Sequence, residues 1–356
     1  MKISFLYGAD LPTFLRLLWQ HRFQVNWRAI PSLILHFLFA LFNTLLSLPE
    51  RFRRHSDDPI KPVFILGHWR SGTTHLHNLM TVDGAYHAPN TFQAAFPHNF
   101  LLSESWLAPL LDKAGPGKRL MDNMKMTMDS VQEEEIGLAS LGAPSSYLAI
   151  HFPKDQARYQ THVSFAEATE QDLVDWEKAH RSFLRKIVAK HGNAQALVLK
   201  SPANTSRIPL LLEMYPDARF VHIHRHPFDC IRSTQHLYDA WFEMAAFQDL
   251  SEMKRQRDES ILDMYEDMHR RWLTDKALIP TDRLLVLGFA ELKADPVAAV
   301  RKIYGFLGDA KLDEGQLQVY LDSIRTYQQN RYAPLSEDMK RRIQERMGFV
   351  FEAFGY

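Results

Sequence analysis

The segment Val63–Thr74, which reads Val-Phe-Ile-Leu-Gly-His-Trp-Arg-Ser-Gly-Thr-Thr, constrains the fold more than any other part of the chain. Its first four residues are apolar, as in a buried strand, and Gly67 and Gly72 bound a loop. A helix is expected to follow from Thr73 to Met80. In a strand, glycine loop and helix start of this kind, the loop N–H groups and the helix dipole converge on an anion. The segment therefore predicts a phosphate site.

One position separates this loop from the loops that bind ATP. The spacing of Gly67 and Gly72 is that of an ATP-binding P-loop, but Thr73 stands where that motif has its lysine. The only fixed cation inside the loop is Arg70. We therefore expect a phosphorylated nucleotide other than magnesium-bound ATP.

Charge and cysteine content limit the classes of function. Lys and Arg together number 42, as do Asp and Glu, so the chain carries no net charge that would favour non-specific nucleic-acid binding. The single cysteine, Cys230, excludes an internal disulfide framework and favours a reducing, cytoplasmic compartment. The sequence has neither a Cys-x-x-Cys pair nor a His-Glu-x-x-His motif, so no metal site is predicted.

Short apolar strands separated by helical stretches predict an α/β fold. The fold class is a central parallel sheet with helices on both faces, of the P-loop-like nucleotide-binding kind. In such sheets, ligands bind beyond the carboxyl ends of the strands. Arg70, Lys200 and Arg225 each follow a predicted strand, so these three cations should converge on one edge. The predicted strands are Pro62–Leu66, Ala196–Leu199, Arg219–His224 and Leu284–Phe289.

The chain is expected to have three parts. Residues 1–58 form an N-terminal helical segment, which a polar break at residues 56–59 separates from the rest. Residues 59–308 form the core, in which residues 81–195 are a helical insertion that would build an acceptor pocket. Residues 309–356 form a C-terminal helical tail.

The N-terminal part contains an apolar helix, predicted from Ile30 to Leu48 with Pro31 in its first turn. Its polar residues lie on one side of a helical wheel. Its length permits a marginal membrane span, since about 20 residues are needed. The polar stripe and nearby arginines suit peripheral contact with a membrane surface through residues 30–48. A helix that covers the protein core fits equally well, so both interpretations stay open. The polar residues are Ser32, His36, Asn43 and Ser47.

Several motifs resemble those of sulfotransferases that use 3′-phosphoadenosine 5′-phosphosulfate (PAPS). Arg70–Thr74 resembles the family's 5′-phosphosulfate loop, and Arg225–Ser233 resembles its 3′-phosphate motif, in which a serine follows an arginine by eight residues. Leu197–Pro202 resembles the strand that carries a lysine in the tyrosylprotein and Golgi-like branch. Phe289–Leu292 with Asp295 and Pro296 resembles a further family segment. The motifs keep the family order across residues 60–308, closer to that branch and to bacterial members than to soluble aryl sulfotransferases.

The resemblance implies PAPS as co-substrate, no metal, and transfer of a sulfuryl group to a hydroxyl. Arg70 would contact the 5′-phosphate and the sulfuryl oxygens, and Lys200 would neutralise the leaving group. Arg225 and Ser233 would bind the 3′-phosphate, which distinguishes PAPS from ATP. The loop and helix start would complete the 5′-phosphate site through Ser71, Gly72, Thr73 and Thr74.

The general base does not follow the family patterns. Soluble aryl sulfotransferases have a histidine two residues after the strand lysine, where this chain has Pro202. The tyrosylprotein branch has a glutamate about twenty residues after the loop arginine, where this chain has Asn90 and Thr91. Both departures leave the base to be sought elsewhere.

An acidic cluster supplies the first candidates for the base, Glu133 and Glu134, and His98 is the second choice. Ser130 and Glu133 also fit a helix capping box, and Glu134 could be merely solvated. A buried glutamate would have its pKa raised toward the working pH, as a general base requires. The capping and catalytic interpretations of Glu133 both remain.

The predicted function is a PAPS-dependent sulfotransferase whose acceptor is a hydrophobic or lipid-like alcohol at the inner face of a membrane. A carbohydrate or a small phenol is the alternative acceptor. Two other classes of function are an ATP-dependent P-loop phosphotransferase and a non-catalytic nucleotide-binding protein. Thr73 in place of the P-loop lysine argues against the phosphotransferase, and a binding protein would need neither Lys200 nor Arg70. The sequence does not predict the oligomeric state.

Overall fold

The computed structural model describes residues 4–50, 59–114, 126–192, 196–325 and 332–356, and it forms two compact units. Most of the predicted polar break, residues 56–58, lies outside the described ranges. One unit, here called the helical unit, comprises residues 1–58, 89–193 and 238–256. The other, the sheet unit, comprises residues 59–88, 194–237 and 257–356. The three-part division expected from the sequence remains a prediction.

The sheet unit contains a parallel sheet in the order β2-β1-β3-β4, as the fold class required. Ile65 pairs with Lys200, Leu66 with His222, and His224 with Gly288. With this register, all four strands end at the same edge of the sheet. The strand predictions are confirmed to within two residues at each end. The strands are β1 Val63–Leu66, β2 Val198–Lys200, β3 Arg219–His224 and β4 Leu284–Gly288.

Helices cover both faces of this sheet because alternate strand residues are apolar on both sides. Val63 and Ile65 pack in a core with helices α3, α12 and α13. On the other face, the rings of Phe64 and Phe220 stack at 5.7 Å, and His222 stacks at 3.8 Å on Trp272 of helix α11 (Ser251–Asp275). The helices that lie in this unit alone are α3 Thr73–Thr81, α9 Ile208–Met214, α12 Phe289–Ala294, α13 Pro296–Leu307, α14 Glu314–Ser323 and α15 Glu337–Phe354.

The described part of the helical unit consists of short and long helices, of which α8 (Glu170–His191) is the longest that lies in this unit alone. Two further helices, α10 Pro227–Ala245 and α11 Ser251–Asp275, contribute residues to both units. The helices of this unit are α1 Leu11–Gln20, α2 Ile30–Ser47, α4 Thr91–Ala95, α5 Phe100–Ala114, α6 Glu134–Ser140, α7 Gln156–Gln160 and α8 Glu170–His191. Single 3₁₀ turns occur in both units at Phe5–Gly8, Trp27–Ala29, Ser146–Ile150, Pro153–Asp155, Thr161–Val163, Pro202–Ser206, Lys276–Leu278 and Thr281–Arg283.

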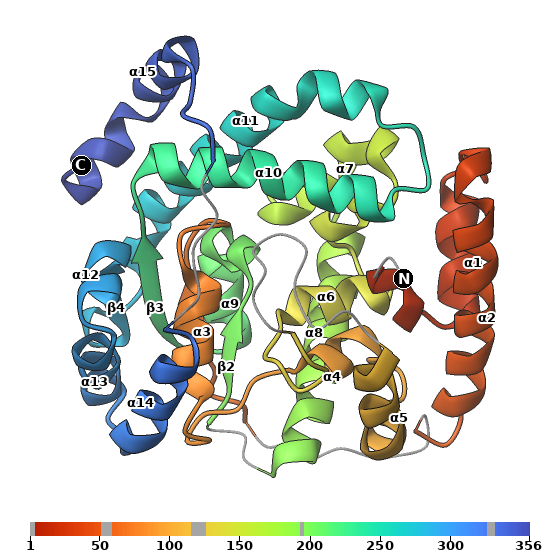
Figure 1. Ribbon diagram of the computed structural model, residues 1–356, viewed down its shortest axis with the longest axis horizontal. Coiled ribbons are helices and arrows are strands. Elements are labelled where there is room, and N and C mark those ends of the chain that lie inside the picture. The colour runs from red at the N-terminus through yellow and green to blue at the C-terminus, as the bar shows by residue number, and fades with distance from the viewer. Residues whose placement is uncertain (1–3, 51–58, 115–125, 193–195, 326–331) are drawn as a thin grey trace. The chain divides into compact units, whose positions relative to one another are not determined.

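Helix α2 lies beside α1 (Figure 1) and packs with its polar side inward. His36 and Asn43 are fully buried, and Asn43 Nδ2 donates to the carbonyls of Tyr7 at 2.7 Å and Ala9 at 3.1 Å. The segment Trp27–Ser47 is the one part of the described chain that is long and apolar enough to cross a membrane by length and composition. Helix α2 thus packs on the protein through its polar side, as one of the two interpretations expected. Its apolar side is not covered by that interpretation.

Candidate active site

The glycine loop of the sheet unit needs both of its glycines. Gly67 has φ 145° and Gly72 has φ 108°, a region of backbone conformation that side chains disfavour. A Cβ on Gly67 would lie 2.4 Å from the carbonyl oxygen of Ile223, and one on Gly72 would lie 2.4 Å from the ring of Phe289. The loop therefore packs directly against the end of β3 and the start of α12. Gly67 N also donates to Thr205 Oγ1 at 2.8 Å.

The start of α3 has the features of an anion site. Gly72 occupies the N-cap position, and no side chain caps the first N–H groups of the helix. These groups and the helix dipole favour a negative charge. The Ser71 side chain is 1% exposed, and its Oγ has no hydrogen-bond partner among the described residues. A buried hydroxyl without a partner is costly, so this oxygen points to a polar ligand at the loop.

The three predicted cations meet around this loop. Lys200, at the end of β2 and 2% exposed, places Nζ 3.3 Å from Thr74 Oγ1. Arg225, just after β3, donates from Nη1 to the carbonyl oxygen of Arg70 at 3.3 Å. Arg70 Nε in turn donates to Ser233 Oγ at 2.9 Å. Side chains from three distant parts of the chain thus surround one turn, as the parallel sheet led us to expect.

Arg225 also contacts two side chains at the strand edge. Its Nη2 lies 3.4 Å from Asp229 Oδ2, and its guanidinium lies 4.7 Å from the ring centre of Phe289. Asp229 also accepts a hydrogen bond from Arg232 Nη2 at 2.9 Å. These contacts orient the Arg225 guanidinium at the strand edge, and its buried Nε has no partner in the described chain.

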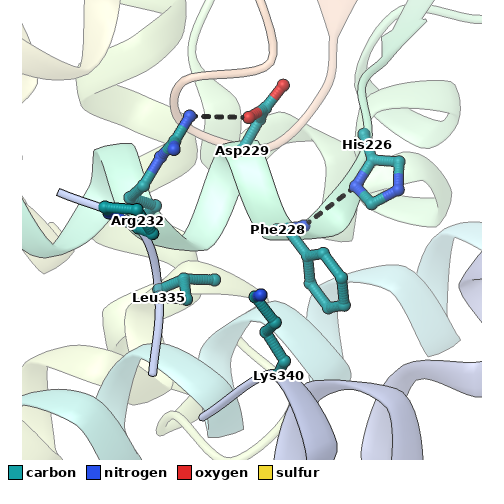
Figure 2. A pocket seen from close by; sticks show the side chains of 7 residues that line it. His226, Phe228, Asp229, Arg232, Leu335 and Lys340 are labelled. Atoms are coloured by element: carbon teal, nitrogen blue, oxygen red, sulfur yellow. Dashed lines mark hydrogen bonds and ion pairs between the residues drawn. The ribbon is translucent and has the colours of Figure 1, made fainter. Parts of the chain in front are cut away.

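A pocket of about 420 Å³ opens beside the first turns of α10 (Figure 2). Its volume lies in the range of small-molecule sites. Arg232 and Lys340 bring positive charge to it, and the Phe228 ring supplies an apolar wall. Arg232 belongs to the segment Arg225–Ser233 that the sequence analysis identified. Lys340 was not identified, because it lies in α15, far along the chain from that segment. The lining residues are His226, Phe228, Asp229, Arg232, Pro334, Leu335 and Lys340.

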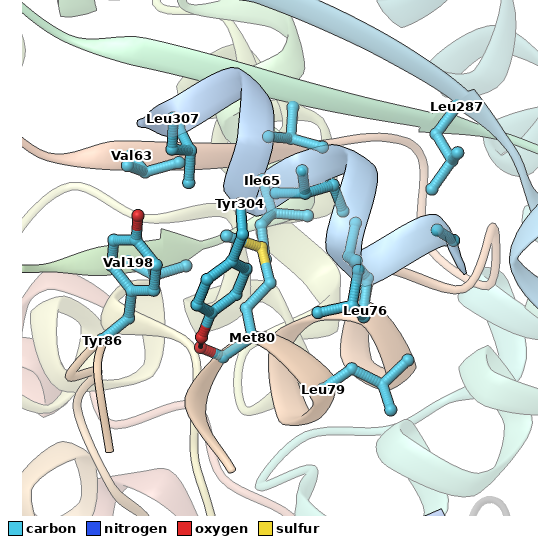
Figure 3. Packing of buried hydrophobic residues seen from close by; sticks show 14 of the residues in the cluster. Val63, Ile65, Leu76, Leu79, Met80, Tyr86, Val198, Leu287, Tyr304 and Leu307 are labelled. Carbon is cyan, nitrogen blue, oxygen red and sulfur yellow. Dashed lines mark hydrogen bonds between the residues drawn. The ribbon is translucent and has the colours of Figure 1, made fainter. Parts of the chain in front are cut away.

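The loop rests on an apolar core (Figure 3). Leu76, Leu79 and Met80 of α3 pack with the inner residues of the strands and with α13. Tyr304 of α13 donates its hydroxyl to the carbonyl of Met80 at 3.3 Å. The helix that begins at the predicted anion site is therefore held by this packing, which keeps its first N–H groups in place.

Histidines near the loop are held neutral. Burial lowers the pKa of His77 to about 3, and the charge of Lys200 adds to the effect. Burial and the neighbouring His269 lower the pKa of His68 to about 3. Burial also lowers the pKa of His75. The positive charge at the loop therefore comes from arginine and lysine.

The acidic cluster belongs to the helical unit and is buried. Helix α6 begins at Glu134, and Glu133 makes no capping hydrogen bond. The predicted capping box is therefore wrong, because Ser130 Oγ instead accepts from the N–H of Thr127 at 2.9 Å. Glu134 is fully buried, so its interpretation as a solvated residue is also wrong. The carboxylate of Glu133 accepts a hydrogen bond from the hydroxyl of Tyr147.

His98 also lies in the helical unit, with Nδ1 3.9 Å from Asp10 Oδ2. The structure thus gathers the predicted nucleotide-binding residues within the sheet unit, whereas the candidates for the base belong to the other unit. The role of base stays a prediction for Glu133, Glu134 and His98. Among the described residues, no group of three or more His, Cys, Asp or Glu side chains could hold a metal ion.

Comparison with known proteins gives consistent results. Residues 62–313 match the sequence pattern described as the sulfotransferase family. The chain is 30% identical to the omega-hydroxy-beta-dihydromenaquinone-9 sulfotransferase Stf3 of Mycobacterium bovis and of Mycobacterium tuberculosis, over 98% of this chain and 90% of theirs.

Two solved structures share the fold. Sulfotransferase STF9 from Mycobacterium avium has a TM-score of 0.68 at 17% identity, covering 97% of this chain and 96% of its own. Sulfotransferase STF1 from Mycobacterium tuberculosis has a TM-score of 0.64 at 19% identity, covering 95% and 94%. At these identities, the likeness concerns the fold alone.

Proposed function

This chain belongs to the sulfotransferase family, and from that premise we propose that it transfers the sulfuryl group of PAPS to the hydroxyl of a hydrophobic, lipid-like acceptor and releases 3′,5′-ADP. The observation that supports this most is the meeting of Arg70, Lys200 and Arg225 around one glycine loop. A donor with phosphates at two positions needs such a set of fixed cations.

The loop and α3 hold the 5′-phosphate in this proposal. The N–H groups from Thr73 onward, which no side chain caps, and the hydroxyls of Ser71 and Thr74 would contact it together with the Arg70 guanidinium. Arg225 and Ser233 bind the 3′-phosphate, each already in contact with Arg70. When bound, PAPS supplies an activated sulfuryl group whose leaving group is a phosphate.

Lys200 stabilises the charge that develops on the bridging oxygen. As the acceptor oxygen forms its bond to sulfur, the bond from sulfur to the phosphate oxygen breaks, and that oxygen gains negative charge. A cation that is already fixed and buried stabilises such charge without reorganisation. Lys200 is 2% exposed, and its Nζ contacts Thr74 in the first turn of α3. There the positive charge of the lysine adds to that of the helix dipole.

A side chain that acts as a general base takes the proton of the acceptor hydroxyl. Glu133 and Glu134 are the first candidates and His98 the second. The bond between Tyr147 and Glu133 would orient that carboxylate.

A lipid-like acceptor is favoured over a carbohydrate or a small phenol. The Stf3 relatives bear a name that specifies a menaquinone-derived acceptor, and α2 exposes apolar side chains. The proposed location is the cytoplasm, at the inner face of a membrane. The single cysteine, Cys230, is buried and suits a reducing compartment.

Two measurements test the proposal. In a thermal shift series, 3′,5′-ADP should stabilise the protein, whereas ATP with Mg²⁺ should not; at a hundred times its Kd a ligand adds about 2.7 kcal/mol. Stabilisation by ATP with Mg²⁺ alone would instead support a phosphotransferase. Transfer of ³⁵S from PAPS to a lipid extract then separates an enzyme from a binding protein, and sugar and phenol acceptors assayed in parallel test the acceptor class.

A further inference from the structure

Helix α2 has its polarity reversed relative to an ordinary surface helix. Its buried residues are small or polar, whereas every residue exposed beyond about a third of its surface is apolar. An amphipathic helix of a soluble protein buries its apolar stripe instead. The buried residues are His36, Ala40, Asn43 and Ser47, and the exposed ones are Ile30, Pro31, Ile34, Phe37, Leu38, Leu41, Phe42 and Leu45.

The exposed apolar side chains continue into α1 and the turn between the helices. Trp19 and Trp27 are 73% and 72% exposed. Leu15 and Phe23 are exposed as well. Together with the exposed residues of α2, these side chains are called the apolar face below. An apolar patch of this extent marks a binding surface.

The stretch of chain that carries the apolar face has charged residues of one sign only. The stretch from residue 11 to residue 49 contains no Asp or Glu and has three arginines. Arg22 and Arg28 are exposed, and the Arg28 guanidinium lies 5.4 Å from the ring centre of Trp27. Tryptophan and arginine side by side at the edge of an apolar surface suit the headgroup region of a bilayer.

We propose that the apolar face lies in the surface of an anionic bilayer, with α2 in the plane of the membrane and its polar side held by the protein. A protein partner would need polar groups among the apolar ones, and the exposed side of α2 offers none. This proposal stands apart from sulfuryl transfer, because it can be measured without donor or acceptor.

The polar side of α2 excludes a transmembrane arrangement. His36 Nε2 is hydrogen-bonded to Ser4 Oγ at 2.7 Å, and its Nδ1 to the carbonyl of Ser32 at 2.6 Å. Asn43 Nδ2 donates hydrogen bonds to the carbonyls of Tyr7 and Ala9. A span surrounded by lipid would break the bonds to Ser4, Tyr7 and Ala9 and leave these groups unpaired in hydrocarbon. Only the apolar half of α2 is suited to lipid.

The first test is co-sedimentation of the full chain with vesicles of phosphatidylcholine and phosphatidylglycerol in equal amounts. The wild type should sediment with them, and Ile34→Glu, Leu38→Glu and Leu45→Glu should each weaken partition about tenfold or more. Val319→Glu and Leu278→Glu, which are exposed apolar positions in the sheet unit, serve as matched controls and should bind like the wild type.

A charge variant tests the headgroup contact. Arg28→Glu should weaken binding to the anionic vesicles more than to pure phosphatidylcholine, and added salt should reduce that difference. Wild-type protein that fails to bind anionic vesicles would overturn the proposal. So would a stable dimer in vesicle-free buffer that Ile34→Glu dissociates, because a second copy would then cover the face.

Depth measurements test the orientation. Cys230 is buried, so single cysteines at Ile30, Leu38 and Leu45 can be labelled with a fluorophore. Lipids brominated along their chains should quench all three labels equally if α2 lies in the plane. Deepest quenching at position 38, with shallow labels at both ends, would show a span and overturn the in-plane arrangement.

Discussion

The guanidinium of Arg70 donates from Nε to Ser233 Oγ at 2.9 Å, across 163 residues of chain. Arg225, the other half of the predicted 3′-phosphate motif, donates to the carbonyl of the same arginine. The two segments that are predicted to bind phosphate are therefore hydrogen-bonded to one another rather than merely close. A change in either segment should alter the geometry of both.

Arg225→Ala should weaken the binding of 3′,5′-ADP about ten- to hundredfold, because one charged hydrogen bond is worth about 1.5–3 kcal/mol. Calorimetric titration measures this directly. Arg271→Ala, which removes a surface ion pair with Asp267, is the control and should bind normally. Unchanged affinity of Arg225→Ala would refute its role at the 3′-phosphate.

Lys200→Met should lower kcat about a hundred- to a thousandfold, as for loss of one group that stabilises transition-state charge. The side chain is almost fully buried, so an uncharged chain of similar length should preserve the packing. Affinity for 3′,5′-ADP should change much less than kcat. Equal losses in both quantities would mean that Lys200 serves binding and not the leaving group.

Gly67→Ala should destabilise the protein by about 1–3 kcal/mol and impair nucleotide binding, because it adds a clash with Ile223 at a backbone angle that alanine disfavours. Thermal unfolding reports the first effect. Gly348→Ala in α15, where a Cβ would meet no atom within 4 Å, should instead be neutral or stabilising. If both substitutions changed the free energy of unfolding in the same direction, the result would argue against a strained loop.

The variants Glu133→Gln and Glu134→Gln test the base. Loss of the true base should lower turnover at least about a hundredfold. Glu243→Gln, an exposed residue of the helical unit paired with Lys254, should keep normal turnover. If both cluster variants retain full activity, the cluster is not the base, and His98→Gln becomes the next measurement.

Acid should unfold the protein through its buried histidines. The folded-state pKa of His68 and of His77 is about 3, and that of His269 about 4, each lowered mainly by burial from 6.5. Below pH 6.5 the unfolded chain therefore binds protons that the folded chain does not, and the free energy of unfolding falls as the pH drops toward 4.

Melting temperatures between pH 7.5 and 4.5 check this expectation. His269→Gln should reduce the steepness of the decline, whereas His236→Gln, at an exposed position, should leave it nearly unchanged. Identical pH profiles for the wild type and both variants would contradict it.

The strand bounds of the sheet were predicted well from the sequence. Short apolar runs, the glycines of the loop and the cations that follow the strands are local patterns, and they do not depend on distant parts of the chain. Lys200 and Arg225 could be placed at one sheet edge from strand order alone. The fold class and the family were predicted correctly for this reason. Burial depended on distant parts of the chain and could not be predicted. Glu134 looks solvated in its own segment but is enclosed by the helical unit, and Lys340 reaches its pocket from the C-terminal helix.

For the apolar helix α2, too, the buried contacts could not be predicted from the sequence. Its bounds and polar stripe were evident from the sequence. The carbonyls of Tyr7 and Ala9 that the stripe binds belong to the 3₁₀ turn Phe5–Gly8 and the residue after it, which the sequence analysis did not predict. Two open interpretations, a packed helix and a surface-seeking one, turned out to concern opposite sides of α2. Its packed side is established, and its membrane contact remains a proposal.

The inward-facing Asn43 has a practical consequence for anyone who wishes to express this protein. Deleting the first fifty residues to improve solubility would strip the helical unit of His36 and Asn43 together with their partners. Replacing exposed leucines of α2 with polar residues would keep every one of those hydrogen bonds. Recombinant production should therefore rely on point substitution rather than truncation.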